Sequence, residues 1–273
     1  MYKLFFLLII SMASAQSYRF VYEYKMKPDA AKKDSAITDY MNLDTDGKKS
    51  YFYNSAKYER DSIYAVTKNF NDLLQAKSYD QNLSYIVEKD YTGKKINFYD
   101  NFKTVNIVIP ETASPKWKIE KEFTKINNMN CQKATAYYKG RTWEAWFSKD
   151  YPVNDGPYKF NGLPGLIIRL NDTENDHVFN LIQIKKINAL SLHLPKSSKQ
   201  LTLEEYKKAM ANYTFTNEDI EGMDIGKQEG RVSIRLKDGY IAKFAADEIK
   251  KVQKLDEEIT KRLKRTNNYI ERN

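Results

Sequence analysis

Alternating apolar and polar positions are the dominant pattern of this chain. Between residues 18 and 26, an aromatic ring or methionine occupies every second position, with mostly polar residues between them. This is the period of a β-strand with one buried face. Similar strand-forming runs recur at residues 50–53, 62–66, 83–99, 103–109, 117–123, 134–147, 177–187, 231–236 and 240–244. Residues 27–49 are dominated by lysine and aspartate, so they predict a polar loop or short helix.

Glycine-containing turns divide several of these runs into hairpins. Gly93 lies in the turn 91–94, Gly140 between the runs 134–138 and 142–147, and Gly239 in the Asp-Gly pair that links 231–236 to 240–244. Glycine adopts the positive φ that tight hairpin turns need. Neighbouring strands should therefore pair in antiparallel fashion.

Two segments depart from the β period. Thr202 and Glu205 have the spacing of a capping box at the start of a short helix. Near the C-terminus, about residues 246–266, apolar residues at 249, 252, 255, 259 and 263 predict an amphipathic helix. Its apolar stripe could pack on the sheet or bind a partner.

These patterns together predict a mainly β (β-rich α+β) protein. We expect a large curved antiparallel sheet or a partly closed barrel, with a C-terminal amphipathic helix. No internal repeat or linker is visible, and residues 16–273 have the length of one domain. We therefore expect a single β-rich domain after the N-terminal leader.

Residues 1–15 have the features of a secretory signal peptide. Lys3 precedes the apolar run 4–10, and the small residues 13–15 follow it, which predicts cleavage after Ala15. The apolar run is too short to span a bilayer, and we expect no transmembrane segment in the mature chain. The single cysteine, Cys131, cannot close an intramolecular disulfide and does not lie at the cleavage point, as a lipoprotein signal would require.

The charge adds little that is specific. The formal net charge is +9, and removal of Lys3 with the leader leaves +8. Basic residues are mixed with acidic ones along the whole chain, which is typical of a solvated surface. For an exported protein this favours envelope partners over nucleic acid, and we expect no nucleic-acid binding.

The densest motif lies between residues 140 and 170. It contains the turn residues Gly140 and Arg141, the aromatic pair Trp143 and Trp146, the turn Gly156-Pro157, and a hexapeptide box. The box consists of Gly162, Leu163, Pro164, Gly165, Leu166 and Ile167. Pro164 and Gly165 fit the two central positions of a type II turn, and the apolar residues of the box should anchor that turn in the core. We interpret these twelve residues as a structural motif.

The motif resembles the GLPGLI family of exported proteins from Gram-negative bacteria. Cys131, Gly140-Arg141, the run 143–147, Gly156-Pro157 and the box occur in the order usual for that family. The resemblance is firmest over residues 130–170. It implies a location in the periplasm or on the outer surface, and it implies no reaction, cofactor or catalytic residue.

Three groupings of residues could carry chemistry. Cys131 with His177 would be a cysteine-hydrolase pair, and Glu144 between two tryptophans could be a carboxylate with a raised pKa. The loop 171–176 offers several oxygen ligands but lacks the glycine and spacing of an EF-hand calcium loop. Alternation instead places Glu144 beside Trp146 on the face opposite Trp143, exposed or paired with Arg141. We therefore assign no catalytic, cofactor or metal-binding residue.

Three functions remain open on this evidence. The first is a non-enzymatic envelope protein that binds a protein partner or a small hydrophobic or glycan ligand, since 14% of the residues are aromatic. The second is an exported hydrolase that uses a carboxylate or the Cys131–His177 pair. The third is a structural surface protein that docks a neighbour through its C-terminal helix.

Overall fold

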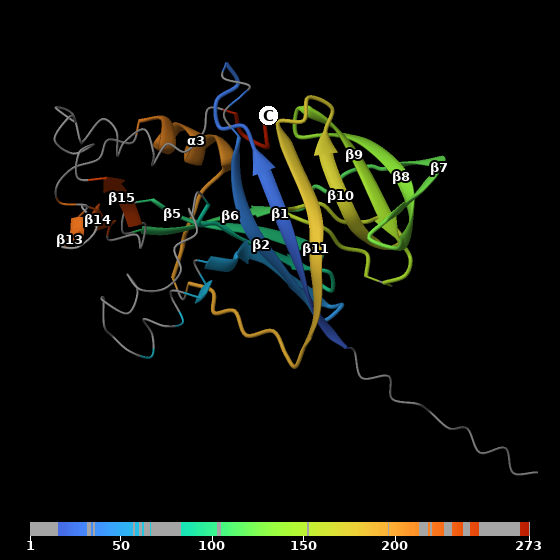
Figure 1. Cartoon of the computed structure of the whole chain (residues 1–273), viewed down its shortest axis with the longest axis horizontal. Coiled ribbons are helices and arrows are strands. Elements are labelled where there is room, and N and C mark those ends of the chain that lie inside the picture. The colour runs from blue at the N-terminus through green and yellow to red at the C-terminus, as the bar shows by residue number, and fades with distance from the viewer. Residues whose placement is uncertain are drawn as a thin grey trace, which may run out of the picture.

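The computed structural model describes residues 16–31, 34, 36–56, 58–59, 62, 66, 83–102, 105–151, 153–195, 197–212, 218, 220–226, 231–236, 241–245 and 268–272. The predicted leader and the predicted helix at 246–266 lie outside these residues. Within them the protein is mainly β (Figure 1). None of the helices in this part of the chain combines the length and apolar character that crossing a membrane would need.

Twelve of the described strands form one large sheet. Their order is β12-β6-β5-β4-β3-β2-β1-β11-β10-β9-β8-β7, and every neighbouring pair is antiparallel except β12 with β6. The strands of this sheet are β1 (Ser17–Met26), β2 (Ile37–Thr45), β3 (Lys49–Asn54), β4 (Ile86–Asp90), β5 (Lys95–Phe102), β6 (Val105–Glu111), β7 (Lys118–Ile126), β8 (Met129–Tyr138), β9 (Arg141–Ser148), β10 (Leu166–Asp172), β11 (His177–Ile187) and β12 (Lys199–Gln200). A separate sheet contains β13 (Ile220–Gly226), β14 (Arg231–Leu236) and β15 (Ile241–Ala245). The large sheet is the curved, open form of the predicted architecture.

The inner face of the sheet is the core. Along β1, the alternating residues Phe20, Tyr22, Tyr24 and Met26 are all buried, as their period predicts. Tyr24 stacks on Phe179 of the neighbouring strand β11 with ring centroids 4.0 Å apart. Aromatic rings of this size each bury about 150–250 Å², so they supply much of the apolar surface that stabilises the fold.

The prediction of a loop or short helix at residues 27–49 is wrong for residues 37–45. Residues 37–45 form β2, which pairs with β1 on one side and β3 on the other. Asp44 is fully buried and accepts hydrogen bonds from Arg19 at 2.7 Å and from Tyr53 at 2.9 Å. Partners on the neighbouring strands make these polar residues compatible with a central strand.

One further predicted strand is wrong, and another is present at the edge of the sheet. Ser62 and Val66 have helical backbone, so the strand predicted at 62–66 is wrong for these residues. The run at 117–123 does form a strand, β7, but β7 lies at the edge of the sheet and Phe123 is 69% exposed.

The predicted helix after Thr202 is confirmed as α3 (Leu203–Ala211). The Thr202 hydroxyl accepts from the backbone N–H of Glu205, and the Glu205 carboxylate accepts from the backbone N–H of Thr202. These two bonds satisfy donors that a helix start leaves without intrahelical partners.

The long loop between β9 and β10 folds back over the inner face of the sheet. Phe160 of this loop packs on Trp143 of β9 with ring centroids 4.5 Å apart. On the other side, Lys89 of β4 donates to the carbonyl oxygen of Gly156 at 2.6 Å. Because β4 and β9 are not neighbours in the sheet, the curved sheet and this loop together enclose the core (Figure 1).

Candidate functional site

The hexapeptide box forms a tight corner at the start of β10. The N–H of Gly165 donates to the carbonyl oxygen of Leu163 at 2.8 Å, so the chain turns around Pro164 in three residues. This is a γ-type turn, and the predicted four-residue type II turn is wrong. Gly165 does have a positive φ, of 155°. A Cβ atom at Gly165 would lie 2.2 Å from the carbonyl oxygen of Ser148, so close packing also requires glycine.

The apolar residues of the box are buried, as predicted. Leu163 is 1% exposed, and Leu166 and Ile167 are fully buried. Tyr22 of β1 donates its hydroxyl to the carbonyl oxygen of Ile167 at 2.6 Å. A Cβ atom at Gly156 would lie 2.5 Å from the Ile167 side chain, so the Gly156-Pro157 turn packs directly on the box.

A buried lysine holds the Gly156-Pro157 turn in place. The Lys89 ammonium lies 2.5 Å from a carboxylate oxygen of Asp155 and also donates to the carbonyl oxygens of Gly156 and Phe160. Burial lowers the pKa of Lys89, and Asp155 opposes that shift. The ammonium has three oxygen acceptors, so its geometry is that of a structural anchor.

The two tryptophans of the motif lie on opposite faces of β9, as alternation predicts. Trp143 is fully buried and donates its indole N–H to the carbonyl oxygen of Tyr138. Trp146 lies on the other face and donates to Glu144. Glu144 pairs with Lys133 at 2.9 Å, so its predicted pairing with Arg141 is wrong. This partly exposed ion pair does not resemble a buried catalytic carboxylate.

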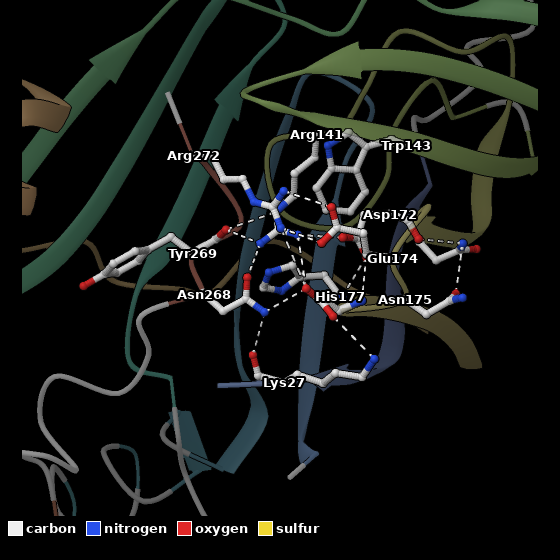
Figure 2. A network of polar contacts seen from close by, with 12 residues as sticks. Lys27, Arg141, Trp143, Asp172, Glu174, Asn175, His177, Asn268, Tyr269 and Arg272 are labelled. Atoms are coloured by element: carbon white, nitrogen blue, oxygen red, sulfur yellow. Dashed lines mark hydrogen bonds and ion pairs between the residues drawn. The ribbon is translucent and has the colours of Figure 1, made fainter. Parts of the chain in front are cut away.

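Arg141 is the centre of a buried polar network (Figure 2). It donates to Asp172 at 2.6 Å, and its guanidinium also donates to the side-chain oxygen of Asn268 and the backbone oxygen of Tyr269. Arg141 is 3% exposed, so these bonds replace the water that its charge would otherwise require. Arg141, predicted from the motif as a turn residue, therefore links β9 to Asn268 and Tyr269, more than a hundred residues later in the chain.

The acidic loop considered for calcium belongs to the same network. Asp172, Glu174 and Asp176 place carboxylate oxygens within 4.8 Å of one another. These carboxylates already face cations, however: Asp172 pairs with Arg141, Glu174 with Arg272 at 2.7 Å, and Asp176 with Lys27 at 3.4 Å. The backbone N–H groups of residues 176 and 177 also donate to Asp172. The cluster is therefore charge-compensated by the protein itself.

Cys131 and His177 do not form a catalytic pair. The Cys131 thiol contacts the carbonyl oxygen of Met129, and burial raises its pKa. His177 shares a 2.7 Å hydrogen bond with the Tyr24 hydroxyl through Nδ1. Burial, with a smaller contribution from the positive charge of Arg141, lowers the pKa of His177 to about 3. The histidine is therefore neutral at physiological pH and buried beside an aromatic ring.

Residues 268–272, the C-terminal segment, complete a second buried network. Glu271 is 3% exposed, accepts hydrogen bonds from Lys159 at 2.5 Å and from the Tyr158 hydroxyl, and forms an ion pair with Lys139 at 3.2 Å. Burial alone would raise the pKa of Glu271, but Lys159 and these hydrogen bonds hold it below its usual value. Glu111 of β6 pairs with both Lys139 and Lys159.

An aromatic pocket lies where this segment, the inner face of the sheet and α3 meet. Its volume is about 730 Å³, a figure that includes space open to solvent. Its rings come from Tyr24, Tyr85, Phe98, Tyr158, Tyr206 and Tyr269. Aliphatic side chains include Leu83, Leu203, Met210 and Ile270. Apolar walls with a few polar groups are the usual character of a small-molecule site.

Helix α3 covers the pocket with one face. Leu203, Tyr206, Lys207 and Met210 all line it, at the spacing of neighbouring turns of a helix. Tyr206 packs edge-on against Phe98 at 5.9 Å and donates its hydroxyl to Asp100 at 2.7 Å. The helix is thereby fixed over β5.

Comparisons with known proteins agree with the β architecture. Residues 90–169, which include most of the motif, match the model of a family described as "Protein of unknown function (Porph_ging)". That region spans β5 to β9 and most of the box strand β10. No curated protein is similar to the chain in sequence.

Solved structures of PNGF-II in the P21 and C2 space groups share the fold. Each has a TM-score of 0.53 and 17% sequence identity to this chain. Each alignment covers 81% of this chain and 40% of the PNGF-II chain, so this chain spans about two fifths of that protein's length. At this identity the likeness concerns the fold alone.

The pocket residues were not predicted from the sequence motif. None of the twelve motif residues lines the pocket, which is formed by strands, α3 and the C-terminal segment. One signal was available in the sequence. Lys207 lies four residues after Leu203 and three before Met210, on the apolar face of the predicted helix, whereas an ordinary surface lysine belongs on the opposite face.

Proposed function

We propose that this protein binds a small molecule with a flat apolar body in the aromatic pocket, and that the motif at 140–170 supports this pocket structurally. The observation that carries the proposal is the set of six rings around one opening. Rings stack face to face or edge to face with a flat ligand and bury apolar area at the same time. Met210 and Leu203 lie on the helix that covers the opening.

The pocket is supported by rigid elements. Tyr158 and Lys159 belong to the loop that Lys89 anchors, and Tyr269 and Glu271 to the segment that Arg141 holds. A site whose walls are fixed by buried hydrogen bonds loses little conformational entropy when a ligand binds. This supports binding as the function in preference to hydrolysis, because Cys131, His177 and Glu144 each have structural partners.

The experiment uses 2-naphthamide, a neutral flat probe, with ligand-observed NMR and calorimetry. The wild-type protein should bind it saturably. Met210→Trp, which fills the pocket from α3, should weaken binding at least about tenfold. Lys208→Trp places the same ring on the exposed face of α3 and should leave binding unchanged. Absence of saturable binding to the wild type, or equal binding by both variants, would contradict the proposal.

We also propose that the binding takes place outside the cytoplasm, in the periplasm or on the outer surface. The support is the leader pattern of residues 1–15 and the resemblance described above. Expression of the full chain in a Gram-negative host, followed by fractionation and N-terminal sequencing, tests this. The expected product starts at Gln16 and is found in the envelope fraction. A chain that stays in the cytoplasm with Met1 or Tyr2 at its start would reject the location.

A further inference from the structure

Lys207 is the unusual member of the pocket lining. It projects from the apolar face of α3 and is partly buried. In the described part of the chain it makes no ion pair or hydrogen bond, whereas the other lysines near the pocket are paired. A partly buried ammonium without an acceptor is costly, so its position needs an explanation.

Among the described residues, the carboxylates near Lys207 all have other partners. Glu271 and Glu111 both bind Lys139 and Lys159. Asp100, which also lines the pocket, is bound by Ser84 and Tyr206. Lys207 therefore lies at the wall of a mostly apolar pocket with no carboxylate partner of its own in this part of the chain.

The electrostatic environment agrees with this position of Lys207. Burial lowers the pKa of Lys207; Glu271 opposes the shift, and the positive charges of Lys139 and Lys159 add to it. An anion beside Lys207 would relieve the repulsion among the three ammonium groups.

We propose that the pocket ligand is an amphipathic anion: a molecule whose flat apolar body lies among the rings and whose carboxylate is bound by the ammonium of Lys207. This rests on the proposed function and narrows it to a class of ligand. A carboxylate accepts hydrogen bonds from an ammonium more strongly than a neutral amide does, and burial strengthens the interaction further.

The test compares 2-naphthoate with 2-naphthamide, which have the same ring system but differ in charge. At neutral pH the wild-type protein should bind the carboxylate about tenfold or more tightly than the amide, as expected for one charge-assisted hydrogen bond. Lys207→Met should abolish this preference while amide binding persists. Lys208→Met changes a neighbouring lysine on the exposed face and should retain the preference.

The outcomes separate this inference from the proposed function. If the wild type binds neither probe, both proposals fail. If it binds both probes with equal affinity, or if Lys207→Met keeps the preference for the carboxylate, the anion site is wrong and the aromatic pocket stands. Thermal unfolding of both methionine variants shows whether the fold is retained. Calorimetric titration with 2-naphthamide then compares whichever of them stays folded with Met210→Trp. Weaker binding by Met210→Trp locates the remaining binding in the same pocket.

Discussion

Two buried cations, Arg141 and Lys159, organise the polar interior of this protein at the scale of single residues. Arg141 is bound by Asp172 and by the C-terminal segment, and Lys159 by Glu111 and Glu271. A buried pair gains little net free energy by itself, because desolvation offsets the attraction. Removing one partner is costly, because the remaining charge is left without compensation.

Glu271→Ala should therefore be strongly destabilising. It leaves the buried ammonium of Lys159 with one carboxylate and takes the acceptor from Tyr158. The expected loss in the free energy of unfolding is about 3–5 kcal/mol, measured by urea denaturation. Arg272→Ala is the matched control, because its pair with Glu174 is exposed and should cost less than about 1 kcal/mol. Similar losses for the two variants would show that the buried network contributes little.

His177 predicts a pH dependence of stability. Its pKa in the folded protein is about 3, and that of an unfolded histidine is about 6.5. The unfolded chain therefore binds the proton first as pH falls, so the stability is present above pH 6.5 and is lost between about pH 6.5 and 3. Between pH 6.5 and 5, above the range of ordinary carboxylates, the loss should be about 1.5 kcal/mol.

The control for this titration is a variant without the imidazole. His177→Gln should flatten the stability curve between pH 6.5 and 5 relative to the wild type. Urea denaturation at several pH values measures both proteins. An unchanged slope in His177→Gln would mean that folding does not lower the pKa of this imidazole.

At the scale of elements, the turns of the motif are fixed by close backbone packing. Gly165 has no room for a Cβ atom, since Ser148 lies against it, whereas Gly162 has a positive φ of 89° and open space around it. Backbone strain alone costs about 1–3 kcal/mol at such positions. Adding a Cβ atom should therefore lower the free energy of unfolding much more at Gly165 than at Gly162.

Gly165→Ala should lose at least about 3 kcal/mol of stability or fail to fold, because strain and a backbone clash act together. Gly162→Ala should lose about 1 kcal/mol, from strain alone. Chemical denaturation of the two variants gives the comparison. If Gly165→Ala is as stable as Gly162→Ala, the close contact with Ser148 is not a constraint of the fold.

Most strands were predictable because aromatic residues on their inner faces alternate with polar ones, and this pattern is formed by residues close in sequence. The turn of the hairpin at Gly140 and the capping box of α3 were predictable for the same reason. β2 was not, because the partners of Asp44 lie on other strands. The turn in the box was placed correctly but assigned the wrong type, since proline and glycine fit both a type II and a γ-type turn.

At the scale of the whole molecule, the candidate site is built from distant parts of the chain. Its walls come from β1, residues 83 and 85, β5, the loop before β10, the start of β11, α3 and residues 269–271. No local pattern joins these segments, because each contributes only one to four side chains to a common space. This is why the motif was visible in the sequence and the pocket was not.

The same arrangement changes how the third function must be tested. Deleting residues 249–273 to remove the predicted C-terminal helix also removes Asn268 and Glu271, which bind buried cations. That deletion should unfold the protein whatever the helix does. Removing residues 249–266 alone and replacing them with a flexible linker keeps both residues. A folded protein that leaves its complex would then support docking by the helix.

The late position of the C-terminal segment has a consequence for biosynthesis. Residues 268–272 are translated after every other described part of the chain, yet they line the pocket, accept hydrogen bonds from Arg141 and supply the second carboxylate that binds Lys159. A nascent polypeptide that has released the entire large sheet from the ribosome has Asp172 to pair with Arg141 and Glu111 to pair with Lys159, but it lacks these further partners. Under the proposed function, ligand capture waits for residues 268–272, and products that stop before them should be inactive and sensitive to proteases.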